Sequence, residues 1–170
     1  IVLNSNDNLE QQTKYLEDQL KNCTAKWKIV TCHHSVFSPA RGRDFKFARE
    51  NWKPLLDKYN VDLVLNGHDH TYARGHVPVR TSDGDTTELG TVYVTSVSGP
   101  KQYGLDRKQI LAYKSQGYQS DKTAEQTQFF QVITIEDNSL EYIAYTVLGD
   151  EYDRAIITKD FATGKKSLKD

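Results

Sequence analysis

The stretch that decides the fold is VDLVLNGHDH, at residues 61–70. Its first half is a short apolar run, interrupted only by Asp62, of the kind that forms a strand buried in a sheet. Its second half brings Gly67, His68 and His70 to the point where that strand ends. Because open α/β sheets place their sites at the ends of such strands, this stretch predicts a buried strand with a functional site beside it.

Two more strands and two helices are expected before this stretch. Residues 1–4 and 27–32 are short apolar runs, and residues 9–21 carry leucines at helical spacing. A second helix is expected over residues 45–59, where Pro54 predicts a kink or a fresh start. The alternation of strand, helix, strand, helix and strand is typical of an α/β layer.

The sequence changes character after residue 90. Residues 101–126 are polar and predict a surface loop with little regular structure. The basic segment from Gly164 predicts a frayed end. Four β-rich runs separated by short polar turns are expected at residues 91–98, 128–135, 140–147 and 154–158.

Length and composition indicate one globular domain. The 170 residues are 37% hydrophobic, which is enough to form a core. The 22 basic and 23 acidic residues are spread along the chain without a basic run, so we expect no nucleic acid as a partner. The apolar runs are too short to cross a bilayer, so we expect no membrane as a partner either. The two cysteines, Cys23 and Cys32, are expected to be unpaired thiols.

Three of the five histidines stand where predicted buried strands end. His33 follows one strand, and His68 and His70 follow the next one along the chain. Gly67 is expected to make a tight turn that lets the last two histidines swing towards one point. Imidazole nitrogens bind zinc, iron and manganese. The arrangement therefore favours a metal site over the alternative of three ordinary core histidines.

Other side chains near these strand ends could take part in chemistry. Arg41 and Arg43 lie on a glycine-containing loop, where their guanidinium groups could clamp a phosphate; the alternative is an ordinary solvated loop. His34 could contact the substrate or act as a general acid, or it could merely support the site. Asp69 is expected to point away from its flanking histidines, and His76 is expected to be structural or exposed.

Three runs carry a resemblance to a known family. GHDHTYAR at residues 67–74 resembles the closing motif of the calcineurin-like metallophosphoesterases, in the version that purple acid phosphatases carry. VTCHHSVFS at residues 30–38 is similar to the penultimate motif of that family, and DRAIITK at residues 153–159 also fits. Two ordered motifs, each at a strand end, are much more specific than either alone. The resemblance implies an α/β fold with a mixed sheet and flanking helices, half of a four-layer α/β/β/α sandwich, with residues 1–160 as the C-terminal half of the catalytic domain and 161–170 as a tail.

The resemblance also implies ligands and an activity. His33 and His68 would bind one metal ion and His70 a second, the two ions being divalent or mixed-valence iron, zinc or manganese. The implied reaction is hydrolysis of a phosphate ester, either a monoester or a diester, with His34 as the catalytic residue and Arg41 and Arg43 as substrate-binding residues. The family further implies a secreted or periplasmic location.

The remaining metal ligands of the family have no counterpart in this sequence. Its motifs with two aspartates, an asparagine and, in the purple subgroup, a tyrosine find no match. We therefore expect the N-terminal, carboxylate-bearing half to be missing and the isolated chain to be inactive. The chain is expected to supply one sheet whose apolar inner face needs a cover, from a companion half or by self-association. Tyr72 and Arg74 match the family motif and are expected to pack and pair beneath the site.

Two other hypotheses stay open. A single zinc ion held by His33, His68 and His70, with an open position for water, would make the protein a mononuclear hydrolase. Alternatively, the chain could be a non-catalytic fragment that folds and binds a metal adventitiously. The number of metal ions bound per chain separates these hypotheses from the dinuclear one.

Overall fold

The α/β layer forms as predicted, from three parallel strands and two helices. The computed structural model describes residues 1–80 and 87–170 of the chain. The helix α2 follows a π-helical turn and has Pro54 in its first turn, which is the fresh start expected at that proline. The elements are β1 (Val2–Leu3), α1 (Leu9–Lys21), β2 (Ile29–Cys32), the π-helical turn (Ala48–Trp52), α2 (Lys53–Lys58) and β3 (Leu63–Asn66).

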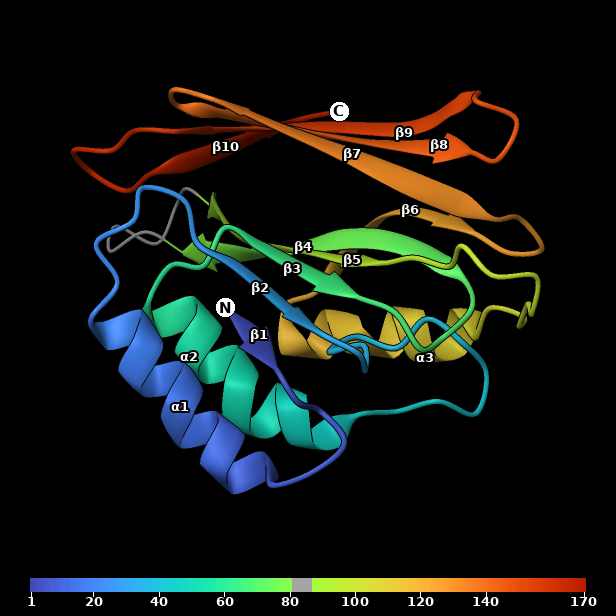
Figure 1. Ribbon diagram of the computed structural model, residues 1–170, viewed down its shortest axis with the longest axis horizontal. Coiled ribbons are helices and arrows are strands. Elements are labelled where there is room, and N and C mark those ends of the chain that lie inside the picture. The colour runs from blue at the N-terminus through green and yellow to red at the C-terminus, as the bar shows by residue number, and fades with distance from the viewer. Residues whose placement is uncertain (81–86) are drawn as a thin grey trace.

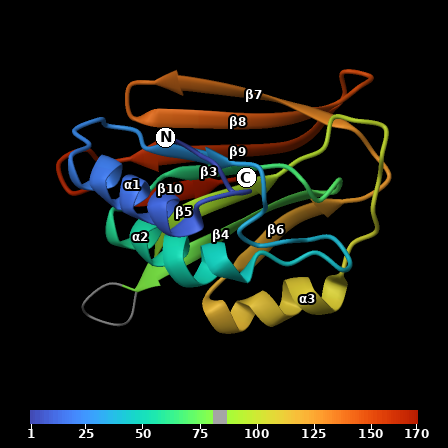
Figure 2. The same ribbon diagram turned by 60° about the horizontal axis from the view of Figure 1, so that its bottom comes forward.

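This layer extends into a mixed sheet that has six strands among the described residues, in the order β1-β2-β3-β5-β4-β6. The added strands are β4 (Tyr72–Arg80), β5 (Thr87–Thr95) and β6 (Gln119–Ala124). Strand β5 runs parallel to β3, whereas β4 runs antiparallel to both of its neighbours. Figure 1 shows α1, α2 and α3 (Arg107–Ala112) together on one side of this sheet, and the turned view in Figure 2 agrees. None of the described helices is long and apolar enough to cross a membrane.

The β-rich second part of the chain forms a separate antiparallel sheet in the order β10-β9-β8-β7. This second sheet lies on the face of the first that is opposite the helices (Figure 1). The described chain is therefore a three-layer α/β/β arrangement, which confirms the predicted fold class. The strands of the second sheet are β7 (Phe129–Glu136), β8 (Ser139–Thr146), β9 (Glu151–Lys159) and β10 (Lys166–Lys169).

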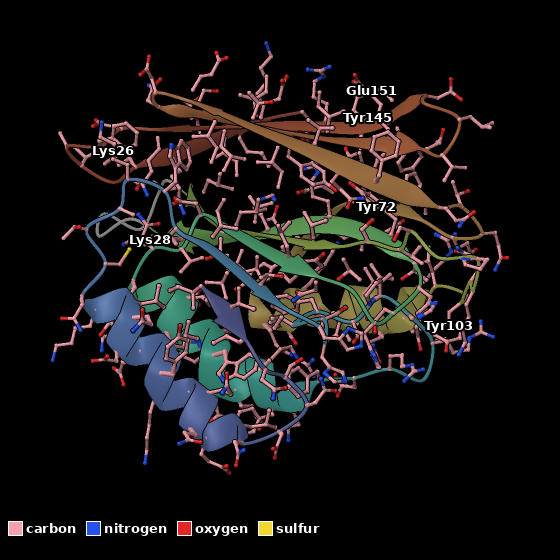
Figure 3. The ribbon with its side chains drawn as sticks, in the orientation of Figure 1. Lys26, Lys28, Tyr72, Tyr103, Tyr145 and Glu151 are labelled. Atoms are coloured by element: carbon pink, nitrogen blue, oxygen red, sulfur yellow. The ribbon has the colours of Figure 1, made fainter. Side chains whose placement is uncertain are left out.

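The expectation of a single sheet with an uncovered inner face is wrong, because the chain covers that face itself. Leu63 and Val92 of the first sheet are buried against Leu140 and Ile157 of the second. Tyr72, labelled in Figure 3, lies between the sheets and donates a hydrogen bond to the Asp153 carboxylate at 2.6 Å. The β-rich run at residues 91–98 joins the first sheet as β5, whereas the three later runs form the second sheet and fold back over the first.

Arg74 also links the two sheets through hydrogen bonds. It was expected to pack and pair with other side chains, and it does. Its Nε and Nη2 donate to the Asp153 carboxylate at 2.8 and 3.0 Å, and its Nη1 pairs with Asp121 at 3.1 Å. A two-point Arg–carboxylate pair fixes orientation as well as distance. His76 also pairs with Asp121, at 2.9 Å, and therefore has a structural role.

Two segments that were expected to lack regular structure are ordered. Within the polar stretch, α3, a 3-10 turn (Tyr113–Gln116) and β6 form, because Tyr113 and Tyr118 are buried against Phe37. The prediction of a frayed end from Gly164 onward is wrong as well, since β10 pairs with β9 along its whole length. Both segments are polar on average, but each contains a few side chains that are buried and hold it in place.

A buried charge cluster fastens β10 to the core. Lys159 Nζ donates to both carboxylate oxygens of Asp62 at 2.9 Å, and Lys166 Nζ lies 3.4 Å from the same carboxylate. Lys166 Nζ also donates to the carbonyl oxygen of Val61 at 2.8 Å. Two ammonium groups thus share one carboxylate away from water. Burial, followed by the nearby Lys159 charge, lowers the pKa of Lys166 from 10.5 to about 8.

Replacing this lysine is expected to change how the stability of the fold depends on pH. The pKa of Lys166 is lower in the folded chain than in the unfolded chain, so the unfolded chain binds more protons between pH 8 and 10.5 and stability rises with pH in that window. Relative to Lys166→Met, the free energy of unfolding of the natural chain should increase by about 3 kcal/mol across the window. Urea unfolding at several pH values measures this, with Lys169→Met on the exposed side of β10 as the matched control. Parallel pH profiles for all three proteins would contradict the cluster.

Candidate metal centre

The two histidine motifs meet because β2 and β3 are adjacent parallel strands. Cys32, the last residue of β2, lies opposite Asn66, the last residue of β3. His33 and His34 therefore leave one strand at the same edge of the sheet where His68 leaves the other. The arrows of β2 and β3 in Figure 1 point in the same direction, which shows this common edge.

Asn66 ties the two strand ends together through its carboxamide. Its Nδ2 donates to the Cys32 carbonyl oxygen at 3.1 Å, and its Oδ1 accepts a hydrogen bond from the Val36 backbone N–H at 3.3 Å. The backbone adds a bond from the Gly67 N–H to the His33 carbonyl oxygen at 3.0 Å. The Ser35 hydroxyl donates to the Gly67 carbonyl oxygen, also at 3.0 Å. Hydrogen bonds within the protein thus hold the two histidine-bearing loops to each other without a bound ligand.

The turn after β3 is made by the histidines themselves, which corrects the role expected of Gly67. His68 and His70 adopt left-handed backbone conformations, with φ of 67° and 51°, whereas Gly67 has no positive φ. Such conformations of residues other than glycine cost on the order of 1–3 kcal/mol each and persist where the surrounding structure enforces them. Because they cluster at functional sites, this pair of strained residues supports a functional role for the loop.

His33, His34 and His68 form one cluster. One ring nitrogen from each lies within 4.8 Å of the other two. His68 Nδ1 is 2.9 Å from His33 Nε2, and the ring centroids of His34 and His68 are 4.2 Å apart. The His33 ring is exposed and the other two rings are half-buried, so the cluster is reachable from solvent.

Ser5 anchors the His34 ring, a contact that the sequence did not indicate. The Ser5 Oγ lies 2.9 Å from His34 Nδ1 and accepts a hydrogen bond from the His34 backbone N–H at 3.0 Å. Ser5 is buried just after β1, so the first strand positions this histidine. The serine is 29 residues away in sequence, and no motif or spacing marks it as part of the site.

Arg43 points into the cluster, whereas Arg41 does not. Arg43 donates one hydrogen bond to His68 Nε2 and one to the Tyr103 hydroxyl, each at 3.0 Å. Arg41 instead lines a separate pocket with Arg107. Since a guanidinium group only donates, His68 Nε2 must carry a lone pair, and in the neutral ring the proton therefore lies on Nδ1. The substrate-binding roles of both arginines stay predictions.

Tyr103 is a second residue that sequence reasoning missed, because it lies in the stretch expected to be an unstructured loop. Its hydroxyl accepts the Arg43 hydrogen bond, and Figure 3 shows it at the end of the molecule where the sheets and α3 meet loops. Hydrogen bonds from Lys101 and then Arg43 lower the pKa of Tyr103. Two cationic side chains therefore converge beside the histidines.

The surroundings of the two half-buried members of the cluster favour the neutral imidazole. Burial, followed by the neighbouring His34 and Arg43, lowers the pKa of His68 to about 4. Burial, followed by His33, also lowers the pKa of His34. Neutral imidazole is the form that binds metal ions.

His70 lies beside the cluster rather than in it. Its Nδ1 is 2.7 Å from the Lys101 carbonyl oxygen, and its ring centroid is 4.9 Å from that of Tyr103. Its nitrogens are not among those that lie within 4.8 Å of one another, so its assignment to a second ion stays a prediction. Asp69, between the two strained histidines, is buried, and this burial raises its pKa to about 6.

The donor set of the cluster fits a transition metal. Three neutral imidazoles suit zinc, copper, nickel or iron, and four-coordinate zinc sites with three protein ligands keep one position open. Among residues 1–80 and 87–170, no carboxylate belongs to this cluster.

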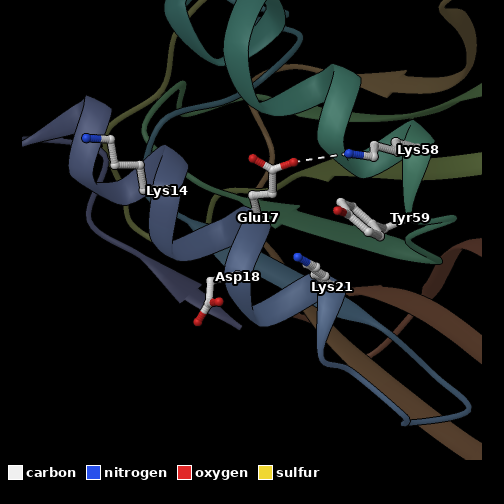
Figure 4. Close-up of a pocket in the computed structure, with 6 residues that line it drawn as sticks. All are labelled: Lys14, Glu17, Asp18, Lys21, Lys58 and Tyr59. Carbon is white, nitrogen blue, oxygen red and sulfur yellow. Dashed lines mark hydrogen bonds and ion pairs between the residues drawn. The ribbon is translucent and has the colours of Figure 1, made fainter.

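A separate pocket of about 400 Å³ between α1 and α2 is lined by Lys, Glu, Asp and Tyr side chains and by no histidine (Figure 4). Its Lys58–Glu17 ion pair is an exposed contact of the ordinary surface kind.

Comparisons with known proteins agree with the motifs and with the fold. Residues 2–72 match the calcineurin-like phosphoesterase family. Purple acid phosphatase 17 of Arabidopsis thaliana is 46% identical over 55 residues, which are 32% of this chain and 16% of that protein. Purple acid phosphatase 7 of the same plant is 26% identical over 164 residues, which are 93% of this chain and 43% of that protein.

Solved structures show the same fold. The purple acid phosphatase PPD1 from yellow lupin seeds matches with a TM-score of 0.66 and 19% identity, over 95% of this chain and 31% of that one. GAP50, described as the anchor in the inner membrane complex of Plasmodium, matches with a TM-score of 0.62 and 18% identity, over 91% of this chain and 47% of that one. The chain thus spans less than half the length of these relatives. On its motifs, its matching residues and its fold, the chain is similar to the calcineurin-like metallophosphoesterases and, among them, to the purple acid phosphatases.

Proposed function

We propose that this chain supplies the histidine side of a metal centre that hydrolyses phosphate esters, either monoesters or diesters. The observation that carries the proposal is the placement of His33, His34 and His68 around one point at the carboxyl ends of β2 and β3. The family kinship supports a phosphatase-type hydrolase. The same kinship supports a secreted or periplasmic location, which we propose together with the activity.

We propose a dinuclear centre with two ions of iron, zinc or manganese, for which further ligands are needed. Two cations about 3.5–4 Å apart repel each other and need bridging anions, which neutral imidazoles do not provide. The described histidine cluster contains no carboxylate. We therefore propose that the bridging carboxylates come from outside this cluster, as a missing N-terminal half would supply them; the relatives are more than twice as long as this chain.

The chemistry of the centre divides between the ions and the side chains of this chain. Bound metal ions polarise the phosphoryl oxygens and lower the pKa of a bound water molecule. Arg43, beside His68, presents a guanidinium fork that matches the geometry of a phosphate. The role of His34 as general acid stays a prediction of the family resemblance, because burial lowers the pKa of its ring and disfavours the protonated form that an acid needs.

We propose that the outer face of the second sheet is the surface that the rest of the enzyme covers. Phe129 packs between the sheets, so Phe130 and Val132 alternate to the outer face, where they are 46% and 44% exposed. Phe130 stacks on Tyr145 of β8, with ring centroids 5.4 Å apart. No described helix lies over this face in Figure 1. A companion half would complete a fourth layer, and self-association would cover the same side chains in its absence.

The first test of the activity compares two lengths of protein. The 170-residue chain alone should turn over an aryl phosphate more slowly than about 1 s⁻¹ with zinc, iron or manganese supplied. A longer protein that also supplies the proposed carboxylate-bearing half should exceed that rate and bind two ions. In that protein, His33→Ala and His68→Ala should each lower activity more than about 100-fold, since both lose a ligand and its metal. His76→Ala, which removes a structural pair outside the cluster, is the control; full activity of metal-loaded His68→Ala would show that the motif is misassigned.

The second test separates the two arginines in the active protein. Arg43→Lys should raise KM for an aryl phosphate by about tenfold, because a lysine keeps the charge and loses the two-point fork. Arg41→Lys is the matched control from the same loop and should leave KM within about twofold. Steady-state kinetics measure both constants. Equal effects from the two substitutions would remove Arg43 from the substrate site.

The third test concerns the exposed sheet face. The isolated chain should associate reversibly in sedimentation experiments at micromolar to millimolar concentration. Phe130→Glu combined with Val132→Thr should shift it to monomer, because both changes remove apolar area from the outer face. Leu111→Glu, at an apolar residue on α3 that is 59% exposed, is the control and should leave association unchanged. A natural chain that remains a monomer throughout would count against the uncovered face.

A further inference from the structure

We propose that the pocket beside Arg41 binds a second phosphate group, so that the preferred substrate is a phosphate ester whose leaving group carries another phosphate. This inference rests on the proposed hydrolysis and adds a substrate class to it. It also gives Arg41 a binding role distinct from that of Arg43. The pocket, called the Arg41 pocket below, has a volume of about 470 Å³ and is lined by Arg41, Leu105, Asp106, Arg107, Lys108 and Glu125.

A tight turn at residues 40–43 sends the two arginines of this loop to different places. The Arg43 N–H donates to the Ala40 carbonyl oxygen at 3.2 Å, and Gly42, between the arginines, has a φ of 70°. Glycine adopts this left-handed conformation without strain. The Arg43 guanidinium group thereby reaches the histidine cluster, whereas Arg41 lines the pocket. Their Cα atoms are at most about 7 Å apart, since a chain advances up to about 3.3–3.6 Å per residue.

A second loop joins the Arg41 pocket to the histidine cluster. The Arg41 N–H donates to the Gly104 carbonyl oxygen at 3.0 Å. The preceding residue, Tyr103, accepts the Arg43 hydrogen bond through its hydroxyl and donates its backbone N–H to the His70 carbonyl oxygen at 3.1 Å. The two loops that meet at Arg41 therefore continue directly into the cluster. A small molecule with two phosphate groups can extend from Arg43 to the pocket.

The two carboxylates of the pocket are engaged by backbone groups. Asp106 Oδ1 accepts a hydrogen bond from the Gln109 N–H at 3.0 Å, and Glu125 Oε2 accepts one from the Leu105 N–H at 2.7 Å. Asp106 caps α3 in this way, so the helix terminus is already occupied. The proposed phosphate is therefore held by side chains and not by the backbone of the helix.

The cationic side chains of the pocket are available to a ligand. Within residues 1–80 and 87–170, neither Arg41, Arg107 nor Lys108 takes part in an ion pair. Three cations and two carboxylates leave the pocket with a positive balance, which attracts anions. A phosphate group offers three acceptor oxygens and close to two negative charges, and a guanidinium fork binds it at two points. The pocket thus suits a phosphate better than a carboxylate.

The reaction is the hydrolysis proposed above, with a defined leaving group. A water oxygen bonds to the phosphorus beside Arg43, and the bond from that phosphorus to the leaving oxygen breaks. The leaving oxygen takes up the proton that the water molecule releases. The products are inorganic phosphate and an alcohol whose remaining phosphate lies in the Arg41 pocket.

A matched pair of substrates tests the pocket. Phenyl phosphate and hydroquinone bisphosphate share an aryl leaving group and differ in the second phosphate on the ring. In a longer protein that supplies the carboxylate-bearing half, kcat/KM per phosphate group should favour the bisphosphate by about tenfold or more. Arg41→Gln combined with Arg107→Gln should reduce this preference to within about twofold. The control, Lys14→Gln combined with Lys122→Gln, removes two exposed charges elsewhere and should retain the preference.

Binding to the chain itself gives a second measurement that needs no catalysis. By isothermal titration calorimetry at one fixed ionic strength, the 170-residue chain should bind inorganic triphosphate about tenfold more tightly than inorganic phosphate. The double arginine variant should lose this difference, and the double lysine variant should keep it. Circular dichroism and thermal unfolding check that each variant folds.

The outcomes separate this proposal from the proposed function. In a longer protein that hydrolyses phenyl phosphate, the kinetic preference decides: its absence, its survival in the double arginine variant, or an equal loss in the double lysine variant would overturn the Arg41 pocket. A longer protein that hydrolyses neither substrate would contradict the proposed hydrolysis instead. The triphosphate titration would then decide whether the pocket binds a second phosphate, and equal binding by the natural chain and the double arginine variant would overturn it.

Discussion

The parallel pairing of β2 with β3 is the constraint on which the site depends. Placing Cys32 opposite Asn66 brings two motifs that are 35 residues apart to one edge of the sheet. The Asn66 carboxamide then locks the edge by bonding backbone groups on both sides of the first histidine pair. A slip of one residue in this register would turn the side chains of β3 to the opposite face and separate the histidines. The chemistry of the cluster is therefore a consequence of sheet register.

The second sheet stabilises the first through buried charges as much as through apolar contact. Asp62 receives Lys159 from β9, and Arg74 of β4 is paired with Asp153 of β9. Such pairs contribute little net stability after desolvation, but breaking one leaves an uncompensated buried charge. They also specify one alignment of the two sheets, since a shifted alignment would bury these charges without partners. The strand β4, which begins just beyond the strained histidines, is fixed by this alignment.

The sequence was informative where apolar periodicity and motif spacing coincide, and uninformative where single side chains decide. The strands ending at Cys32 and Asn66 and the restart of the helix at Pro54 were predictable, because each follows from a local pattern. The second sheet was read as part of the first, because alternation shows that a strand has two faces but not which sheet it joins. Ser5 and Tyr103 enter the site through contacts that only the tertiary fold creates. The helix α3 was not predicted either, because the stretch around it is polar and the burial of Tyr113 beside it is also a contact of the tertiary fold.

The left-handed conformations of His68 and His70 carry an evolutionary consequence. A left-handed backbone is relieved by glycine and, to a lesser degree, by asparagine, so the histidines hold these positions at a cost to stability. Selection for stability alone would replace them, and only selection for their imidazole rings would retain them. In a lineage that stopped using the metal centre, these two positions should be among the first to drift, and they should drift towards glycine or asparagine. The pair of residues thus records whether a descendant still carries the function.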